Sequence, residues 1–138
     1  MIEDRFLKKW NIGNADRECV MKTIQDFLSE ETDVVFAYVH GSFAEGDGFR
    51  DIDVAVYVRE PHGEMEAESD YSYELSKKTT HRVDVKVINK SPVAFQMAVL
   101  RKGIVLFSRS EGVRTDFIED VSKRYREYVH FRNICLNT

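Results

Sequence analysis

One segment carries most of the structural information in this chain: His40-Gly41-Ser42-Phe43-Ala44-Glu45-Gly46-Asp47-Gly48-Phe49-Arg50-Asp51-Ile52-Asp53-Val54-Ala55-Val56. The residues directly before it, 34–39, are β-branched and aromatic and too few for a helix, so they predict a buried strand that ends at a Gly-Ser turn. From Asp51 onward, apolar and other residues alternate, which predicts a second strand. Because alternate side chains of a strand share a face, Asp51 and Asp53 lie on the same face.

The residue types in this segment suit phosphate and metal chemistry. A glycine backbone bends sharply and lets a phosphate approach its N–H groups. If Phe43-Ala44-Glu45 begins a helical turn, Ser42 is its N-cap, where free N–H groups favour an anion. Asp51 and Asp53 offer hard oxygen ligands for Mg²⁺, and Asp84, on the polar face of a later predicted strand, could complete a two-metal site for transfer at phosphorus.

The rest of the chain predicts one α/β (α+β) domain spanning residues 1–138, with a mixed sheet covered by helices on one face and the metal site at the exposed strand ends. Residues 64–79 indicate a solvated helix or a loop with helical parts, and Ser91-Pro92 resembles an N-cap followed by the first helical position, with Gly103 as the stop. The remaining elements are expected at 15–30 (helix, with Asp16 as a cap), about 34–40, 51–59, 82–88 and 103–107 (strands), and about 114–135 (helix).

Composition limits the function classes. The chain has 138 residues with 20 Lys and Arg against 24 Asp and Glu, a formal net charge of -4, so general nucleic-acid binding is not expected. Cys19 and Cys135 belong to no metal-binding motif and are expected to be buried thiols. No leader or apolar run of membrane length is visible, so a cytoplasmic location is expected and no membrane partner.

The Gly41-Ser42 pair, the Asp51-x-Asp53 pair and Asp84 within Val-Asp-Val resemble the signature of the DNA polymerase β-like nucleotidyltransferase superfamily. The short length is similar to its minimal nucleotidyltransferases, the MNT proteins, including the MntA-type antitoxins of HEPN/MNT pairs. The order of elements from Val34 onward also resembles that family, so the likeness covers most of the chain.

The resemblance implies a nucleotidyltransferase fold and transfer of AMP from ATP to a hydroxyl with release of pyrophosphate. It implies that Asp51 and Asp53 bind two Mg²⁺ ions and that Asp84 helps hold the catalytic metal and activates the acceptor. Gly41 and Ser42 would contact the terminal phosphates of the nucleotide. The implied partner is a HEPN-domain toxin encoded nearby, adenylylated on a tyrosine, and a homo-oligomer is also possible.

The sequence departs from the family pattern in ways that leave alternatives open. Eight residues separate Gly-Ser from Asp-x-Asp where many MNT proteins have ten, and Glu45 stands where an Arg is common, although Arg50 or Lys86 could compensate. One alternative is a non-catalytic antitoxin that neutralises its partner by binding, and another is a small-molecule nucleotidyltransferase.

Each candidate residue also has a purely structural interpretation. Asp51 and Asp53 could form a solvated strand end, although two like charges on one face repel and therefore favour a cation. Asp84 could be an exposed strand residue, and Gly41 and Ser42 could serve only a turn and a cap. His40 is interpreted as a packed strand-end residue with no catalytic role.

Overall fold

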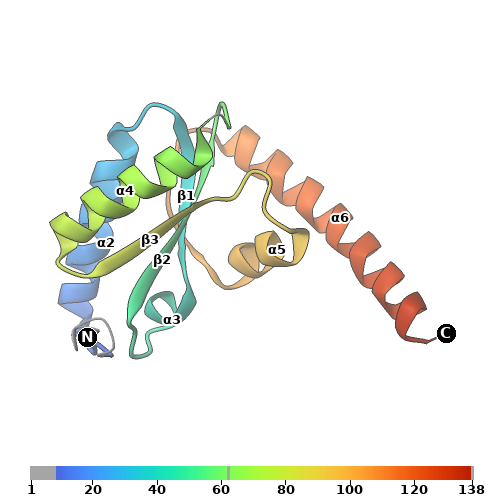
Figure 1. The fold of residues 1–138 in the computed structure, drawn as a ribbon, viewed down its shortest axis with the longest axis horizontal. Helices are drawn as coiled ribbons and strands as arrows, with labels where there is room; N and C mark the ends of the chain where they lie inside the picture. The colour runs from blue at the N-terminus through green and yellow to red at the C-terminus, as the bar shows by residue number, and fades with distance from the viewer. Residues whose placement is uncertain (1–8, 62, 138) are drawn as a thin grey trace.

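The computed structural model describes residues 9–61 and 63–137 and shows a four-stranded sheet with helices on both sides (Figure 1). Along the chain the elements are α2 (Asn14–Glu30), β1 (Val34–His40), α3 (Gly41–Ala44), β2 (Asp51–Val58), α4 (Glu64–Thr79), β3 (Arg82–Val87), α5 (Val93–Lys102), β4 (Ile104–Ser108) and α6 (Glu111–Leu136).

The sheet is mixed, in the order β3-β2-β1-β4. β1 is antiparallel to both β2 and β4, whereas β2 and β3 are parallel and joined through α4. A parallel pair requires such a crossover, because the chain must return to the same end of the sheet before the second strand begins. This topology places the starts of β2 and β3 side by side, and the end of the antiparallel β1 beside them.

Alternation along the strands sorts apolar side chains to two cores. One core packs α2 and α4 against the sheet face that carries Ile52, Val54 and Val83. The other packs α5 and the first half of α6 against the opposite face. The expectation that helices cover one face only is therefore wrong, because both faces of the sheet carry apolar residues. The face that carries the acidic residues at its strand ends is apolar further along the strands, where Phe36, Tyr38 and Ala55 are buried.

The predicted elements are confirmed, with small differences at their ends. The polar segment 64–79 is a continuous helix, α4, whose residues Leu75 and Thr79 are buried. The C-terminal helix begins at Glu111 instead of 114, because the Ser110 side chain accepts a hydrogen bond from the Val113 N–H and caps it. Short-range caps of this kind set helix ends more sharply than apolar periodicity does.

Three predicted caps are wrong. α2 starts at Asn14 with Gly13 as its N-cap, so Asp16 lies in the first turn. Pro92 is itself the N-cap of α5 and not its first residue. Ser42 lies inside α3, because His40 is the N-cap of that short helix.

Two further observations concern the surface. Cys19 and Cys135 are exposed, so the expectation of buried thiols is wrong; Cys135 falls in the last turns of α6, beyond the buried part of that helix. No helix in residues 9–61 and 63–137 combines the length and the apolar character that crossing a bilayer requires.

Candidate active site

The three carboxylates singled out by the sequence lie on the same sheet face at one end of β2 and β3. In the parallel register, Asp53 lies opposite Asp84, and Asp51 lies opposite Arg82. Side chains directly opposite each other in a sheet point to the same face, and neighbouring strands are about 4.8 Å apart. Asp84 is half-buried and pairs with Asp53 in the register, so it lies on the acidic face and not in the apolar interior.

Cationic side chains lie close to two of these carboxylates. Arg82 Nε is 3.6 Å from Asp51 Oδ1, and Lys86 Nζ is 4.0 Å from Asp84 Oδ1. Within the described ranges 9–61 and 63–137, no three acidic, histidine or cysteine side chains converge closely enough to hold a metal ion as they stand. Mutual repulsion between carboxylates favours such separate pairings when no divalent cation is bound.

Asp53 is at the centre of this acidic face. Burial raises the pKa of its carboxyl above the ordinary value, the negative charges of Asp84 and Asp51 raise that pKa further, and Lys86 partly offsets them. The ionised form of Asp53 is therefore costly in the folded protein, and a nearby cation would relieve that cost. The donor set, hard carboxylate oxygens on one face, suits Mg²⁺.

Gly41 lies against the side chain of Asp53, in a backbone conformation that favours glycine. Its φ of 78° is in the left-handed region, and a Cβ added there would lie 2.5 Å from Asp53 Oδ2. Glycine is the residue that satisfies both conditions, because it has no Cβ. The Gly-Ser turn therefore lies directly against the central carboxylate.

A cavity of about 320 Å³ joins this turn to the acidic face. It is lined by Ser42 and Gly48 from the loop, by Asp51 and Asp53, and by the cations Lys9 and Arg50. Positive side chains and a hydroxyl beside carboxylates make a site that can hold a polyphosphate together with a divalent cation. Lys9 had no recognisable motif in the sequence.

Arg17 of α2 stabilises the loop between Gly41 and Arg50 through hydrogen bonds. No local sequence pattern indicated this role. Its guanidinium donates hydrogen bonds to the carbonyls of Phe43 (2.6 Å) and Asp47 (2.8 Å) and lies over the Phe43 and Phe49 rings. The shortened loop is thus held by two charge-assisted hydrogen bonds, which are stronger than neutral ones.

Glu45 is outside the lining of this cavity. Its carboxylate Oε1 lies 4.0 Å from Lys102 Nζ at the end of α5. Arg50, in contrast, lines the cavity. The charge of Glu45 is therefore partly balanced from outside, while Arg50 and Lys9 supply the positive side chains inside.

His40 lies opposite Asp53 in the β1–β2 pairing and packs edge-on against the Phe95 ring, with centroids 5.5 Å apart. Burial lowers the pKa of its imidazole, and the charge of Asp84 partly opposes this. Its Nε2 is buried and makes no hydrogen bond to the described residues. Packing at the strand end agrees with the structural interpretation of this residue.

A mixed sheet whose acidic strand ends lie beside a Gly-Ser turn is the arrangement of a nucleotidyl-transfer domain. A comparison with family models agrees, since residues 22–112 match the model described as Polymerase beta, Nucleotidyltransferase. The chain belongs to this nucleotidyltransferase family, as its motifs led us to expect. A comparison with curated proteins finds no match.

Several solved structures with similar folds are described as toxin–antitoxin complexes. One, described as tri-AMPylated Shewanella oneidensis HEPN toxin in complex with MNT antitoxin, matches at TM-score 0.72 and 16% identity over 88% of this chain and 96% of that chain. A toxin–antitoxin structure with AMP-PNP matches at 0.72 and 18% identity, over 86% and 95%. A MntA–HepT complex matches at 0.67 and 15% identity, over 91% and 97%. At these identities, the likeness shows a shared fold.

Proposed function

We propose that this chain is a Mg²⁺-dependent adenylyltransferase that moves AMP from ATP to a protein hydroxyl, and that it acts as the antitoxin of a HEPN-domain toxin. The observation that carries the proposal is the placement of Asp51, Asp53 and Asp84 on one sheet face against the Gly41-Ser42 turn. Membership of the nucleotidyltransferase family supports the reaction class. The similar folds of MNT antitoxins support the choice of partner.

In this proposal each residue of the site has a role in the transfer. Asp51, Asp53 and Asp84 hold two Mg²⁺ ions, which neutralise the charge that develops on the phosphates. Ser42, Lys9 and Arg50 hold the terminal phosphates in the cavity that they line. Glycine at position 41 lets the polyphosphate approach the backbone next to Asp53.

The bonds that form and break in the proposed transfer show which groups the site must hold in place. The acceptor hydroxyl oxygen bonds to the α-phosphorus of ATP, and the bond between that phosphorus and the oxygen bridging to the β-phosphorus breaks. Pyrophosphate leaves with the bonding electron pair, and the hydroxyl proton passes to the Asp84 carboxylate. Holding the hydroxyl in line with the leaving group supplies much of the rate enhancement in transfers of this kind.

A tyrosine of the HEPN toxin is the proposed acceptor. In the similar Shewanella oneidensis complex the toxin is tri-AMPylated, and a second similar complex contains AMP-PNP, a non-hydrolysable analogue of ATP. The acidic chain, with a net charge of -4, has no basic excess suited to nucleic-acid acceptors.

The test is incubation with α-labelled ATP, Mg²⁺ and the HEPN protein encoded beside this chain. Label should appear on the toxin, and Asp53→Asn should lower the rate at least about a hundredfold, the usual cost of removing one group that stabilises charge in a transition state. Asp70→Asn, which removes an exposed carboxylate of α4, is the control and should keep full activity. Label transfer that survives Asp53→Asn would refute the proposal.

The non-catalytic alternative predicts tight toxin binding without Mg²⁺-dependent ATP binding. The pairing of Glu45 with Lys102, and the presence of Lys9 and Arg50 in the cavity, favour the enzyme over this alternative. Calorimetric titration with ATP and Mg²⁺ separates them, because a binding-only antitoxin would give no heat with the nucleotide yet bind the toxin normally.

A further inference from the structure

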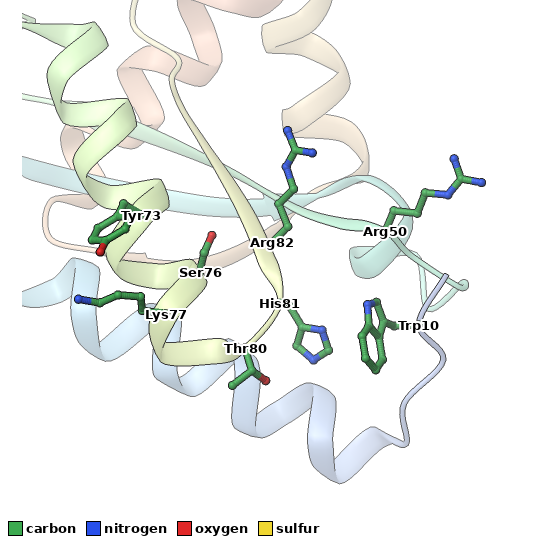
Figure 2. Close-up of a pocket in the computed structure, with 8 residues that line it drawn as sticks. All are labelled: Trp10, Arg50, Tyr73, Ser76, Lys77, Thr80, His81 and Arg82. Atoms are coloured by element: carbon green, nitrogen blue, oxygen red, sulfur yellow. The ribbon is translucent and has the colours of Figure 1, made fainter. Parts of the chain in front are cut away.

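Three rings pack together beside the candidate active site. The Trp10 ring lies edge-to-face against the His81 ring, with centroids 5.1 Å apart. Figure 2 shows these two rings side by side in the wall of a cavity of about 590 Å³. The Phe49 ring packs against His81 as well, with centroids 5.3 Å apart. We call these three residues the ring cluster; they come from the segment before α2, the loop before β2 and the position before β3.

Each member of the ring cluster has a cationic residue as its direct neighbour in the chain. The neighbouring pairs are Lys9-Trp10, Phe49-Arg50 and His81-Arg82. Lys9 and Arg50 line the cavity of about 320 Å³ at the acidic face. Because only one peptide bond separates each ring from a cation, packing of the ring fixes the point from which the cationic side chain extends.

Backbone hydrogen bonds join two of these segments. The Trp10 N–H donates to the Phe49 carbonyl at 2.7 Å, and the Phe49 N–H donates to the Trp10 carbonyl at 3.0 Å, which makes an antiparallel bridge. The Lys9 side chain lies against Gly48, where an added Cβ would be 3.9 Å from its Cβ and Cδ atoms. The segment that carries Lys9 is thus attached to the loop that carries Arg50.

The ring cluster does not itself form the smaller cavity. Among the described residues that line that cavity, none belongs to the ring cluster. Figure 2 shows Arg50 and Arg82 extending away from the Trp10 and His81 rings. Burial lowers the pKa of the His81 imidazole, so this ring is uncharged at neutral pH and attracts no anion. The ring cluster can therefore act on a ligand in the smaller cavity only through the cations beside it.

We propose that Trp10, Phe49 and His81 are positioning residues for polyphosphate binding, which hold Lys9 and Arg50 at the smaller cavity before a ligand arrives. The inference rests on the proposed function, in which these two cations bind the terminal phosphates of ATP. Cations that are held in place bind an anion more tightly, because less conformational entropy is lost on binding. Opening the ring cluster should therefore lower the affinity for polyphosphate although no group that contacts the ligand is removed.

The experiment is a calorimetric titration with magnesium tripolyphosphate, which resembles the phosphates of ATP, carries no base and needs no acceptor. The wild-type protein should bind this probe. Trp10→Ala should bind it at least about tenfold more weakly, because contacts between cations and phosphate oxygens are weakened. His81→Ala opens the ring cluster from a different segment and should have the same effect.

The matched control is Phe27→Ala. Phe27 and Trp10 are both partly buried and pack against the same core, so both alanine variants should lower the melting temperature. Phe27 packs on the Tyr71 ring, with centroids 6.1 Å apart, and is outside the ring cluster. Binding of magnesium tripolyphosphate should be unchanged in Phe27→Ala.

A double-mutant cycle separates positioning from a general loss of stability. In a Lys9→Ala background, one cation through which Trp10 acts is already missing. Trp10→Ala should then weaken binding by at most about threefold, because substitutions that act through the same contact are not additive.

Four results would overturn the inference: no binding of magnesium tripolyphosphate to the wild type, unchanged binding in Trp10→Ala or His81→Ala, an equal loss in Phe27→Ala, or an undiminished effect of Trp10→Ala in the Lys9→Ala background. The titration involves no transfer, so it is separate from the toxin-labelling experiment. Labelled toxin together with binding that is insensitive to Trp10→Ala would refute this inference alone. Absence of label together with Trp10-dependent binding would refute the proposed function alone.

Discussion

On the acidic face, burial and neighbouring negative charges make the ionised form of Asp53 unfavourable, which favours binding of a cation. Asp53 is half-buried among like charges, and its carboxyl pKa is raised for that reason. A group whose pKa is higher in the folded state stabilises the fold while protonated, and that contribution is lost as the pH rises through the raised pKa. At neutral pH the ionised carboxylate therefore destabilises the protein that has no metal bound.

The first prediction follows from this destabilising effect of the ionised Asp53 carboxylate. In the presence of a chelator at pH 7, Asp53→Asn should raise the melting temperature, because a neutral amide avoids the repulsion of Asp84 and Asp51. The gain should shrink as the pH falls through the raised pKa of Asp53 and should be lost near the ordinary carboxyl pKa of about 4, because wild-type Asp53 is then protonated as well. Thermal unfolding across pH, with Asp70→Asn as the control, measures it. A lower melting temperature for Asp53→Asn at pH 7 would contradict the prediction.

Gly41 gives the second prediction, with Gly46 as a matched control. Both have positive φ, 78° and 83°, but a Cβ at Gly41 would collide with Asp53, whereas a Cβ at Gly46 would meet nothing within 4 Å. Each change to Ala should cost about 1–2 kcal/mol of unfolding free energy through the backbone. Only Gly41→Ala should also abolish Mg²⁺-dependent ATP binding, measured by calorimetry. Equal ATP affinity in both variants would show that Asp53 can move aside at no cost.

The helices and strands were predicted well where a sequence pattern repeats along the chain. Features that depend on one contact, such as a helix cap, were predicted poorly. Alternation in 51–58 and 82–87 placed Asp51, Asp53 and Asp84 on the correct face, because strand period and burial act together. The cap of α2 was missed because Gly13 provides no side chain to recognise. Arg17 was missed because its partners lie 26 and 30 residues away, a separation that leaves no local signal.

The edge of the sheet shows another contact that the sequence did not reveal. On β3, the N–H groups of Val83, Val85 and Val87 donate hydrogen bonds to Ser76, Ser72 and Glu68 of α4. These three acceptors are four residues apart, so they lie in a row on one side of the helix. The helix thereby satisfies an edge that would otherwise be open to pairing with another chain.

The third prediction concerns this row. Ser72→Ala leaves the Val85 N–H, on a buried residue, without its 2.9 Å acceptor and should lower the unfolding free energy by about 1–3 kcal/mol. Ser69→Ala, on the exposed side of the same helix, is the control and should change it by less than about 0.5 kcal/mol. Urea unfolding compares the two. Similar values for both variants would mean that water replaces the serine hydroxyl.

At the scale of the whole molecule, the contacts between α6 and the rest of the domain show which part of this long helix unfolds together with the sheet. In its first half, Phe117 and Val121 are buried, Arg114 donates a hydrogen bond to the Tyr38 hydroxyl at 2.9 Å, and Arg124 reaches Gln96 at 2.8 Å. Beyond these contacts the helix extends away from the sheet (Figure 1), and Phe131 is 62% exposed. The structure therefore predicts that only the first half of α6 contributes to global stability.

The fourth prediction tests this with the same substitution at two places on one helix. Phe117 is 7% exposed and packs against the Phe36 and Tyr57 rings, so Phe117→Ala should cost about 3–5 kcal/mol of unfolding free energy. Phe131→Ala should cost less than about 0.5 kcal/mol, because its ring is mostly exposed and makes its ring contact with the neighbouring His130 at the surface. Equilibrium unfolding followed by circular dichroism measures both. A large loss for Phe131→Ala would mean that the outer half of α6 is packed in solution, and a small one for Phe117→Ala that the second core does not hold α6 to the sheet.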